Sequence, residues 1–166
     1  MMSLLRRQLM LAKDTFLTRY PHFWLVWEPG EWSMPGGVDV SVAETKAGGT
    51  AGSPQRPLRG DALCFALKVP EGTTLKVGRA ADNEVLLSDM AISRLHAQLA
   101  LQGGVWSVTA RSETKKTTVD ETELAQGQAL PLRSGQLLGL GEMTVSFYDG
   151  GSFKDRLEQA GPKPKR

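Results

Sequence analysis

The sequence contains very little cysteine and histidine. Cys64 is the only cysteine, and the two histidines, His22 and His96, are far apart in the chain. A single cysteine excludes an intrachain disulfide framework and any site built on several thiolates, and it is usual in a reducing cytosol. There is also no cluster of metal-ligating residues and no recognisable pair of catalytic carboxylates. We therefore expect neither a cofactor or metal nor an enzymatic activity.

Long hydrophobic runs are missing as well. The apolar run that follows Arg6 and Arg7 lasts four residues, whereas a secretory signal needs about 7–15. No stretch approaches the roughly 20 apolar residues of a membrane span. We therefore expect no membrane span and a cytoplasmic location.

Basic charge is scarce in the middle of the chain. The formal net charge is +2, yet residues 71–150 carry 7 basic and 10 acidic side chains, against 5 and 2 in residues 151–166. A folded core that binds nucleic acid needs a basic surface. Since this core is the acidic part, we expect no nucleic-acid partner.

The N-terminal part, residues 1–34, predicts a helix followed by an aromatic strand. Apolar residues recur every three or four positions over residues 3–20, and Pro21 ends the pattern. Residues 22–32 predict a strand, in which Phe23, Leu25 and Trp27 alternate with Trp24 and Val26, as in a strand with two buried faces. Six of the 11 aromatic residues lie within residues 16–32. This segment must therefore pack on the main domain, on a second copy or on another protein.

The apolar stripe of this helix has two interpretations. It packs on the helix's own domain, or it binds a membrane surface or a partner. The opposite face carries Arg6, Arg7, Lys13 and Asp14. Because this face is only mildly basic, we favour packing on the same domain.

The rest of the chain divides into three parts. Residues 35–60 are rich in Gly, Pro and Ser and predict a linker or long loop, and residues 150–166 predict a short helix and a basic tail. Residues 61–149 show short runs of alternating apolar residues, separated by turn residues, with Gly103-Gly104 forming a two-residue hairpin turn. At 166 residues, one all-β sandwich or barrel with extensions is the expected organisation.

Two short motifs carry the chemistry. Val77-Gly78-Arg79 is followed by Ser93-Arg94-Leu95-His96 at the start of an alternating strand. The spacing places a guanidinium group and a hydroxyl group on loops at the same end of a sandwich. Arg offers a planar fork of charged donors and Ser adds another donor, so the pattern indicates a phosphate-binding site.

These motifs, with the later GQALPLRSGQLLGLGEMTVSFYD, resemble the forkhead-associated (FHA) domain over about residues 60–149. The resemblance implies a sandwich of two antiparallel sheets with about eleven strands and no catalytic machinery. It also implies that loops at one end recognise phosphothreonine in a partner protein.

The resemblance assigns roles to individual residues. Arg79 matches the family arginine that pairs with the phosphate, and Ser93 matches the serine that hydrogen-bonds it. Thr114 lies where the family often has a Ser or Thr against the phosphate and the threonine methyl group. Arg94 is placed to reach the phosphate or a residue after it.

Two further residues are expected to support the site rather than contact the ligand. His96 matches the family histidine that braces the recognition loop from inside. Gly78 is expected to meet the conformational requirement of a turn.

The next recognition loop departs from the family. Lys115-Lys116-Thr117 stands where family members commonly have Asn-Gly-Thr, and a lysine cannot accept a hydrogen bond from a peptide N–H. Lys115 either supplies extra positive charge for an acidic or doubly phosphorylated partner, or peptide affinity is reduced. A third alternative is that the true alignment of this loop differs by a residue or two.

Two functions follow as hypotheses. The first is a phosphothreonine-peptide-binding adaptor in Ser/Thr kinase signalling, whose partner is a phosphorylated protein such as a kinase or its substrate. The alternative is an FHA-type assembly module that binds its partner or itself through the aromatic N-terminal segment, with weak or no phosphopeptide binding.

Overall fold

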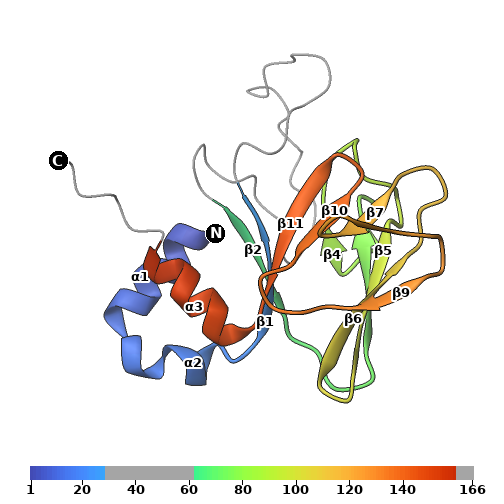
Figure 1. Ribbon diagram of the computed structural model, residues 1–166. Helices are drawn as coiled ribbons and strands as arrows, with labels where there is room; N and C mark the ends of the chain where they lie inside the picture. The colour runs from blue at the N-terminus through green and yellow to red at the C-terminus, as the bar shows by residue number, and fades with distance from the viewer. Residues whose placement is uncertain (29–61, 160–166) are drawn as a thin grey trace, which may run out of the picture.

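The computed structural model describes residues 1–28 and 62–159 (Figure 1). Two β-sheets pack face to face, and three short α-helices lie on the outer side of one of them. The all-β sandwich expected from the sequence is confirmed. The expected linker at residues 35–60 and the end of the basic tail lie outside the described residues.

The larger sheet has six strands in the order β2-β1-β11-β10-β7-β8. Its strands are β1 (Phe23–Trp27), β2 (Leu63–Leu67), β7 (Thr117–Val119), β8 (Thr122–Leu124), β10 (Leu137–Leu140) and β11 (Met143–Tyr148). All of its described pairings are antiparallel.

The smaller sheet has five strands in the order β4-β3-β5-β6-β9. Its strands are β3 (Thr74–Gly78), β4 (Val85–Leu86), β5 (Ala97–Gln102), β6 (Val105–Ala110) and β9 (Ala129–Pro131). The β3–β4 pair is parallel, and the other pairs are antiparallel. Gly103 and Gly104 join β5 to β6 with φ values of +59° and +73°, as the expected two-residue turn requires.

Strand β1 is buried on both faces. Leu25 and Trp27 face the core between the sheets, whereas Trp24 and Val26 face the helices. The expectation of a doubly buried strand is therefore confirmed. However, β1 pairs with both β2 and β11 inside the six-stranded sheet, so the sandwich begins within residues 1–34 rather than after the linker.

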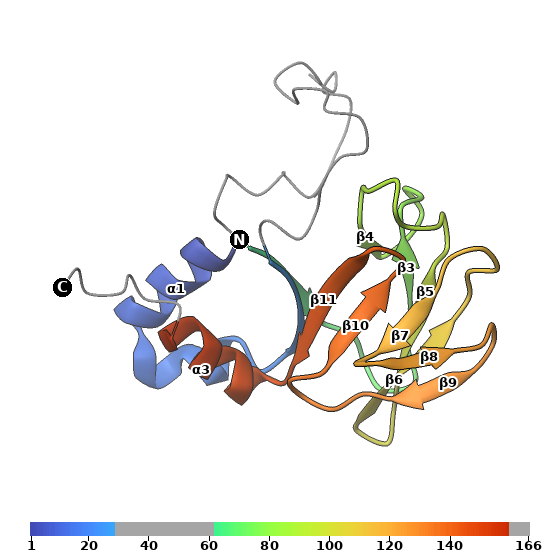
Figure 2. The same cartoon turned by 45° about the horizontal axis from the view of Figure 1, so that its top comes forward.

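The helices are α1 (Met2–Leu11), the 3₁₀ turn η1 (Lys13–Thr15), α2 (Phe16–Arg19) and α3 (Gly150–Gln159). They form one layer on the outer face of the larger sheet (Figure 2). No helix in the described ranges combines the length and apolar character needed to cross a membrane.

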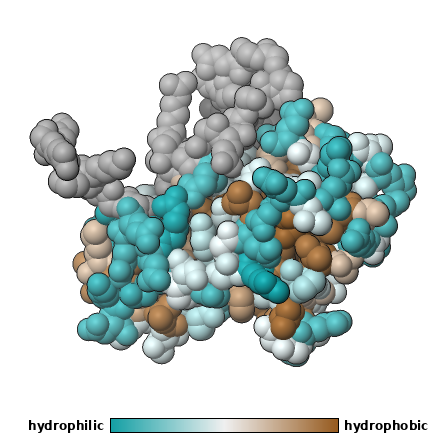
Figure 3. All heavy atoms as spheres, in the orientation of Figure 1, coloured by the Kyte–Doolittle hydropathy of each residue, from teal (hydrophilic) through white to brown (hydrophobic). Residues whose placement is uncertain are grey.

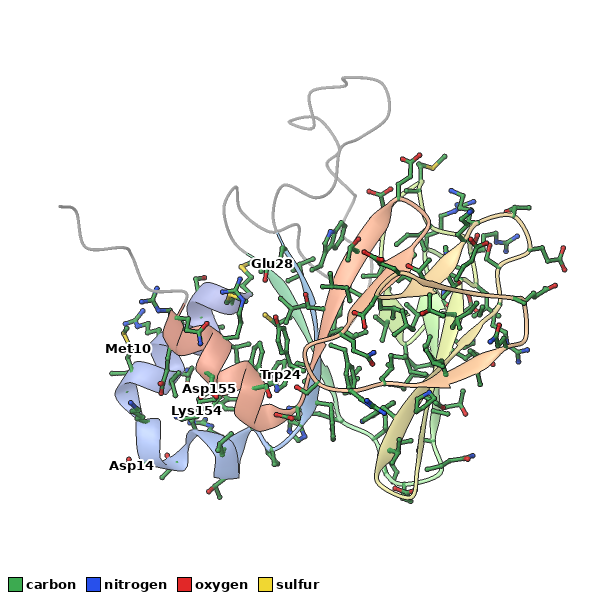
Figure 4. All side chains as sticks on the ribbon, in the orientation of Figure 1. Met10, Asp14, Trp24, Glu28, Lys154 and Asp155 are labelled. Carbon is green, nitrogen blue, oxygen red and sulfur yellow. The ribbon has the colours of Figure 1, made fainter. Side chains whose placement is uncertain are left out.

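The helical layer has its own apolar core. Trp24, which is labelled in Figure 4, stacks on Phe153 of α3 with ring centroids 4.3 Å apart. The buried side chains of Leu9 and Phe16 join the same cluster. The predicted packing of the N-terminal stripe on its own domain is confirmed. The expected single helix over residues 3–20 is wrong, because the chain breaks at Ala12, which has extended φ of −147°. Phe16, beyond this break, is 1% exposed.

Candidate functional site

The two motifs meet at one end of the sandwich through backbone hydrogen bonds. The Arg79 N–H donates to the Ser93 carbonyl, and the Ala80 N–H donates to the Arg94 carbonyl, both at 3.1 Å. The loop after β3 and the loop before β5 therefore run side by side. The last residue of the first motif, Arg79, therefore lies next to the first residue of the second, Ser93.

Gly78 makes this close approach possible. A Cβ atom at this position would lie 2.3 Å from the Arg94 carbonyl oxygen and 2.9 Å from the Ser93 carbonyl oxygen, distances shorter than real Cβ contacts. Gly78 is not among the described glycines with positive φ. Gly78 is therefore needed because two backbones approach closely here. The turn conformation that we expected to require a glycine does not explain its presence.

His96 is hydrogen-bonded from inside to the backbone of two loops. The imidazole is fully buried, its Nδ1 accepts a hydrogen bond from the Ser93 N–H at 3.1 Å, and its Nε2 lies 3.0 Å from the Lys116 carbonyl oxygen. With Nδ1 as the acceptor, Nε2 carries the proton and donates to that carbonyl. Burial lowers the pKa of His96, which keeps the ring neutral. His96 thus connects the backbone at Ser93 to the backbone at Lys116, which is the arrangement expected of a residue that supports the recognition loop.

A pair of hydroxyl groups connects the loop before β5 to the loop after β6. Ser93 Oγ is 2.6 Å from Ser112 Oγ, and the Lys115 N–H donates to Ser112 Oγ at 3.0 Å. Sequence reasoning missed Ser112, since the run RSETKKTT offers no pattern that singles it out. Thr114, the expected hydroxyl of this loop, is exposed.

Two cationic groups are free at this end. Arg79 and Arg94 are exposed, and within the described residues neither guanidinium group forms a hydrogen bond or an ion pair. The backbone of Arg94 is nevertheless fixed, because the buried amide of Asn83 donates to its carbonyl at 2.6 Å and to the Ala80 carbonyl at 2.9 Å. Asn83 is a second supporting residue that the sequence analysis did not assign.

The two lysines of the departing loop are already engaged. Lys115 Nζ donates to the Met90 carbonyl, which ties this loop to the one that carries Ser93. Lys116 Nζ lies 2.8 Å from a Glu123 carboxylate oxygen. Of the two lysines, only Lys116 is paired with a carboxylate, whereas the ammonium group of Lys115 is held by a neutral carbonyl.

The residues that the structure describes contain no group of His, Cys, Asp and Glu able to hold a metal ion. The loops instead carry two exposed guanidinium groups, a pair of hydrogen-bonded hydroxyl groups, and a backbone that buried side chains hold in place. Such a set suits a doubly charged oxyanion presented at the surface, because Arg pairs with phosphate through parallel charged hydrogen bonds.

Comparison with known proteins gives a family and a fold. The matching family model is described as the inner membrane component of T3SS, cytoplasmic domain, and it covers residues 56–151. The solution structure of the FHA domain of an Arabidopsis thaliana hypothetical protein is 20% identical, with a TM-score of 0.51, and the match covers 87% of this chain and 92% of that one. None of the curated proteins matches the chain.

A second similar structure is bacterial. The FHA domain of the CT664 protein from Chlamydia trachomatis is 18% identical with a TM-score of 0.50, and the match covers 76% of this chain and 97% of that one. At these identities the two structures show the fold, an FHA-type β-sandwich, and they extend over more of the chain than the motifs alone.

Proposed function

Because the chain belongs to the family of T3SS inner membrane component cytoplasmic domains and is an FHA-type interaction module, we propose that it binds phosphothreonine peptides at the loops around Ser93. The observation that carries this proposal is the pair of exposed guanidinium groups, Arg79 and Arg94, on the two loops whose backbones are hydrogen-bonded to each other at Ser93 and Arg94. We assign contact with the phosphate to these three residues.

We infer that Ser112 Oγ is the donor in the Ser93–Ser112 pair, which leaves the Ser93 hydroxyl able to donate to a ligand. Ser112 Oγ accepts from the Lys115 N–H, so the Ser112 proton is available for Ser93 Oγ. The Ser93 proton is then free to be donated to a phosphate oxygen. Ser112 thus acts as a positioning residue, and Thr114 and Lys115 border the ligand from the same loop.

Protein partners phosphorylated by Ser/Thr kinases are the ligands that this site fits, and we place the interaction in the cytoplasm in line with the family description. The alternative, assembly through the aromatic N-terminal segment, finds less support. The described aromatic side chains of that segment pack inside the chain's own two cores, and Trp32 lies outside the described residues.

The proposal is tested with an oriented phosphothreonine peptide library, followed by titration of one selected peptide and its unphosphorylated and phosphoserine counterparts. Hydrogen bonds to charged groups contribute about 1.5–3 kcal/mol, so Arg79→Ala should weaken binding about 10-fold to 100-fold. Arg133→Ala is the matched control, because Arg133 is an exposed arginine on the β9–β10 loop. Equal binding of phosphorylated and unphosphorylated peptides would contradict the proposal.

A further inference from the structure

Lys115 brings a positive charge to the loop that departs from the family. Its ammonium group donates to the Met90 carbonyl, and none of the ion pairs in the part of the chain that the structure describes includes it. Asp89, the acidic residue next to Met90, uses one carboxylate oxygen to accept the Ala91 N–H at 2.7 Å. Because an ammonium group has three N–H donors and a neutral carbonyl occupies one of them, Lys115 is able to bind an anion as well.

The side chain of Lys115 is fixed close to the proposed phosphate site. A Cβ atom at Gly141 would lie 3.6 Å from Lys115 Cδ, so the turn between β10 and β11 lies against the aliphatic part of the lysine. The Lys115 N–H donates to Ser112 Oγ at 3.0 Å, and Ser112 Oγ is 2.6 Å from Ser93 Oγ. Burial lowers the pKa of His96, and the charge of Lys115 adds to this effect. The ammonium group is therefore within electrostatic reach of the ring that holds the Ser93 N–H.

Lys115 and Arg94 extend toward different loops. A hydrogen bond from Lys76 lowers the pKa of Asp82, in the loop between β3 and β4, and the charge of Arg94 contributes to this shift. Arg94 therefore lies toward that loop, whereas Lys115 is held at Met90, in the loop between β4 and β5. The two side chains are thus placed to meet different groups of one ligand.

The surface around these loops is mainly hydrophilic. Teal spheres prevail at the upper right of Figure 3, where the loops next to β4 lie in Figure 1. Arg79 and Arg94 supply two positive charges there, which balance the roughly two negative charges of a phosphorylated threonine at neutral pH. Lys115 is a further positive charge, so a ligand with the phosphate alone would leave it without an anionic partner.

We propose that the segment recognised by this chain carries, besides its phosphothreonine, a second acidic group a few residues away, a carboxylate or a phosphate, that pairs with Lys115. This inference rests on the proposed function. Lysine is a compact charge with three rotatable donors, so it pairs with either anion without the planar fit that arginine makes. With lysine in place of the asparagine common in the family, the loop recognises the charge of a partner side chain rather than an N–H of the partner backbone.

The test begins with a library of peptides that have one fixed phosphothreonine and randomised flanking positions. We expect aspartate and glutamate to be enriched at one of these positions by the wild type and not by Lys115→Gln, which lacks the charge but keeps a donor for the Met90 carbonyl. A selected peptide is then titrated beside counterparts that carry the matching amide or a phosphoserine at that position. Replacing the carboxylate by the amide should weaken wild-type binding about fivefold and have little effect in Lys115→Gln. The tighter binder of the carboxylate and phosphoserine peptides identifies the second anion.

Lys116→Gln is the matched control, because Lys116 lies on the same loop and its ammonium group is already paired with Glu123, and it should keep the wild-type preference. Lys115→Arg retains the charge and should keep the preference as well. If phosphothreonine peptides bind without acidic enrichment, or if the enrichment persists in Lys115→Gln, this inference is overturned while the proposed function stands. If no phosphothreonine peptide binds the wild type, the proposed function fails and this inference fails with it.

Discussion

A few buried groups determine the shape of the proposed phosphate-binding end. Both ring nitrogens of His96 are bonded to backbone groups, and the absent side chain of Gly78 leaves room for the neighbouring loop. Neither residue is placed to meet a ligand, yet together they fix where Ser93 lies. The exposed arginines can therefore be flexible without loss of a defined site, because their backbone positions are set from inside.

Ser112 provides a prediction at this scale. Ser112→Ala removes the partner of the Ser93 hydroxyl and the acceptor of the Lys115 N–H, so we expect phosphopeptide affinity to fall about fivefold, the effect of losing about 1 kcal/mol. Titration calorimetry measures the change. Thr114→Ala on the same loop is the comparison and should have the smaller effect, because its hydroxyl is exposed. A larger loss in Thr114→Ala would reverse the assignment of the two hydroxyls.

The sequence identified residues of the proposed site where it contains a motif and gave no indication of the others. Arg79, Ser93 and His96 lie in short motifs whose backbone partners are fixed by spacing, and the structure brings them together. Ser112 lies next to Ser93 only because the fold brings two distant loops together, and no local sequence pattern predicts this contact. Lys115 was identified as a departure, but its bond to the Met90 carbonyl depends on the course of another loop.

At the scale of elements, α3 and β1 hold the helical layer on the sandwich. Phe153 is fully buried and stacks on Trp24, and Arg156 of α3 pairs with Glu28, which follows β1, at 2.8 Å. The alternating strands were predictable because their period is local. The break at Ala12 and the insertion of β1 into the sheet were not, since both depend on packing against residues far along the chain.

Truncating the stacked ring tests the role of this layer. Phe153→Ala should reduce the free energy of unfolding by about 3–5 kcal/mol, because it leaves a cavity beside Trp24. Urea denaturation measures the loss. In Leu137→Ala the replaced side chain is 46% exposed, so about 0.5 kcal/mol is expected. If the two variants lose equal stability, the stack does not hold the helices in place.

At the scale of the whole molecule, the buried histidine makes stability depend on pH. Burial lowers the pKa of His96, and burial together with the charge of Lys68 lowers that of His22. When the pKa of a histidine is lower in the folded state than in the unfolded state, the folded chain is most stable at pH values above the pKa of the unfolded state. This contribution is lost as the pH falls, because the unfolded chain then binds more protons.

The free energy of unfolding should therefore decrease as the pH falls below about 6.5, by up to about 1.4 kcal/mol per pH unit for each histidine. Denaturant titrations over this range measure the slope. His96→Gln should flatten it at the expense of overall stability, whereas His22→Gln should change it less, because His22 is more exposed. A slope that is the same in His96→Gln and the wild type would show that His96 does not titrate in this range.

The position of β1 between β2 and β11 has a consequence for biosynthesis. Leu25 pairs with Phe147, more than a hundred residues further along the chain, so a ribosome must have made β11 before the larger sheet can close. Until then the apolar side chains on both faces of β1 are exposed to solvent. Pairings this distant in sequence slow folding and prolong exposure to aggregation. The nascent chain is therefore expected to depend on chaperones that shield its first strand during translation.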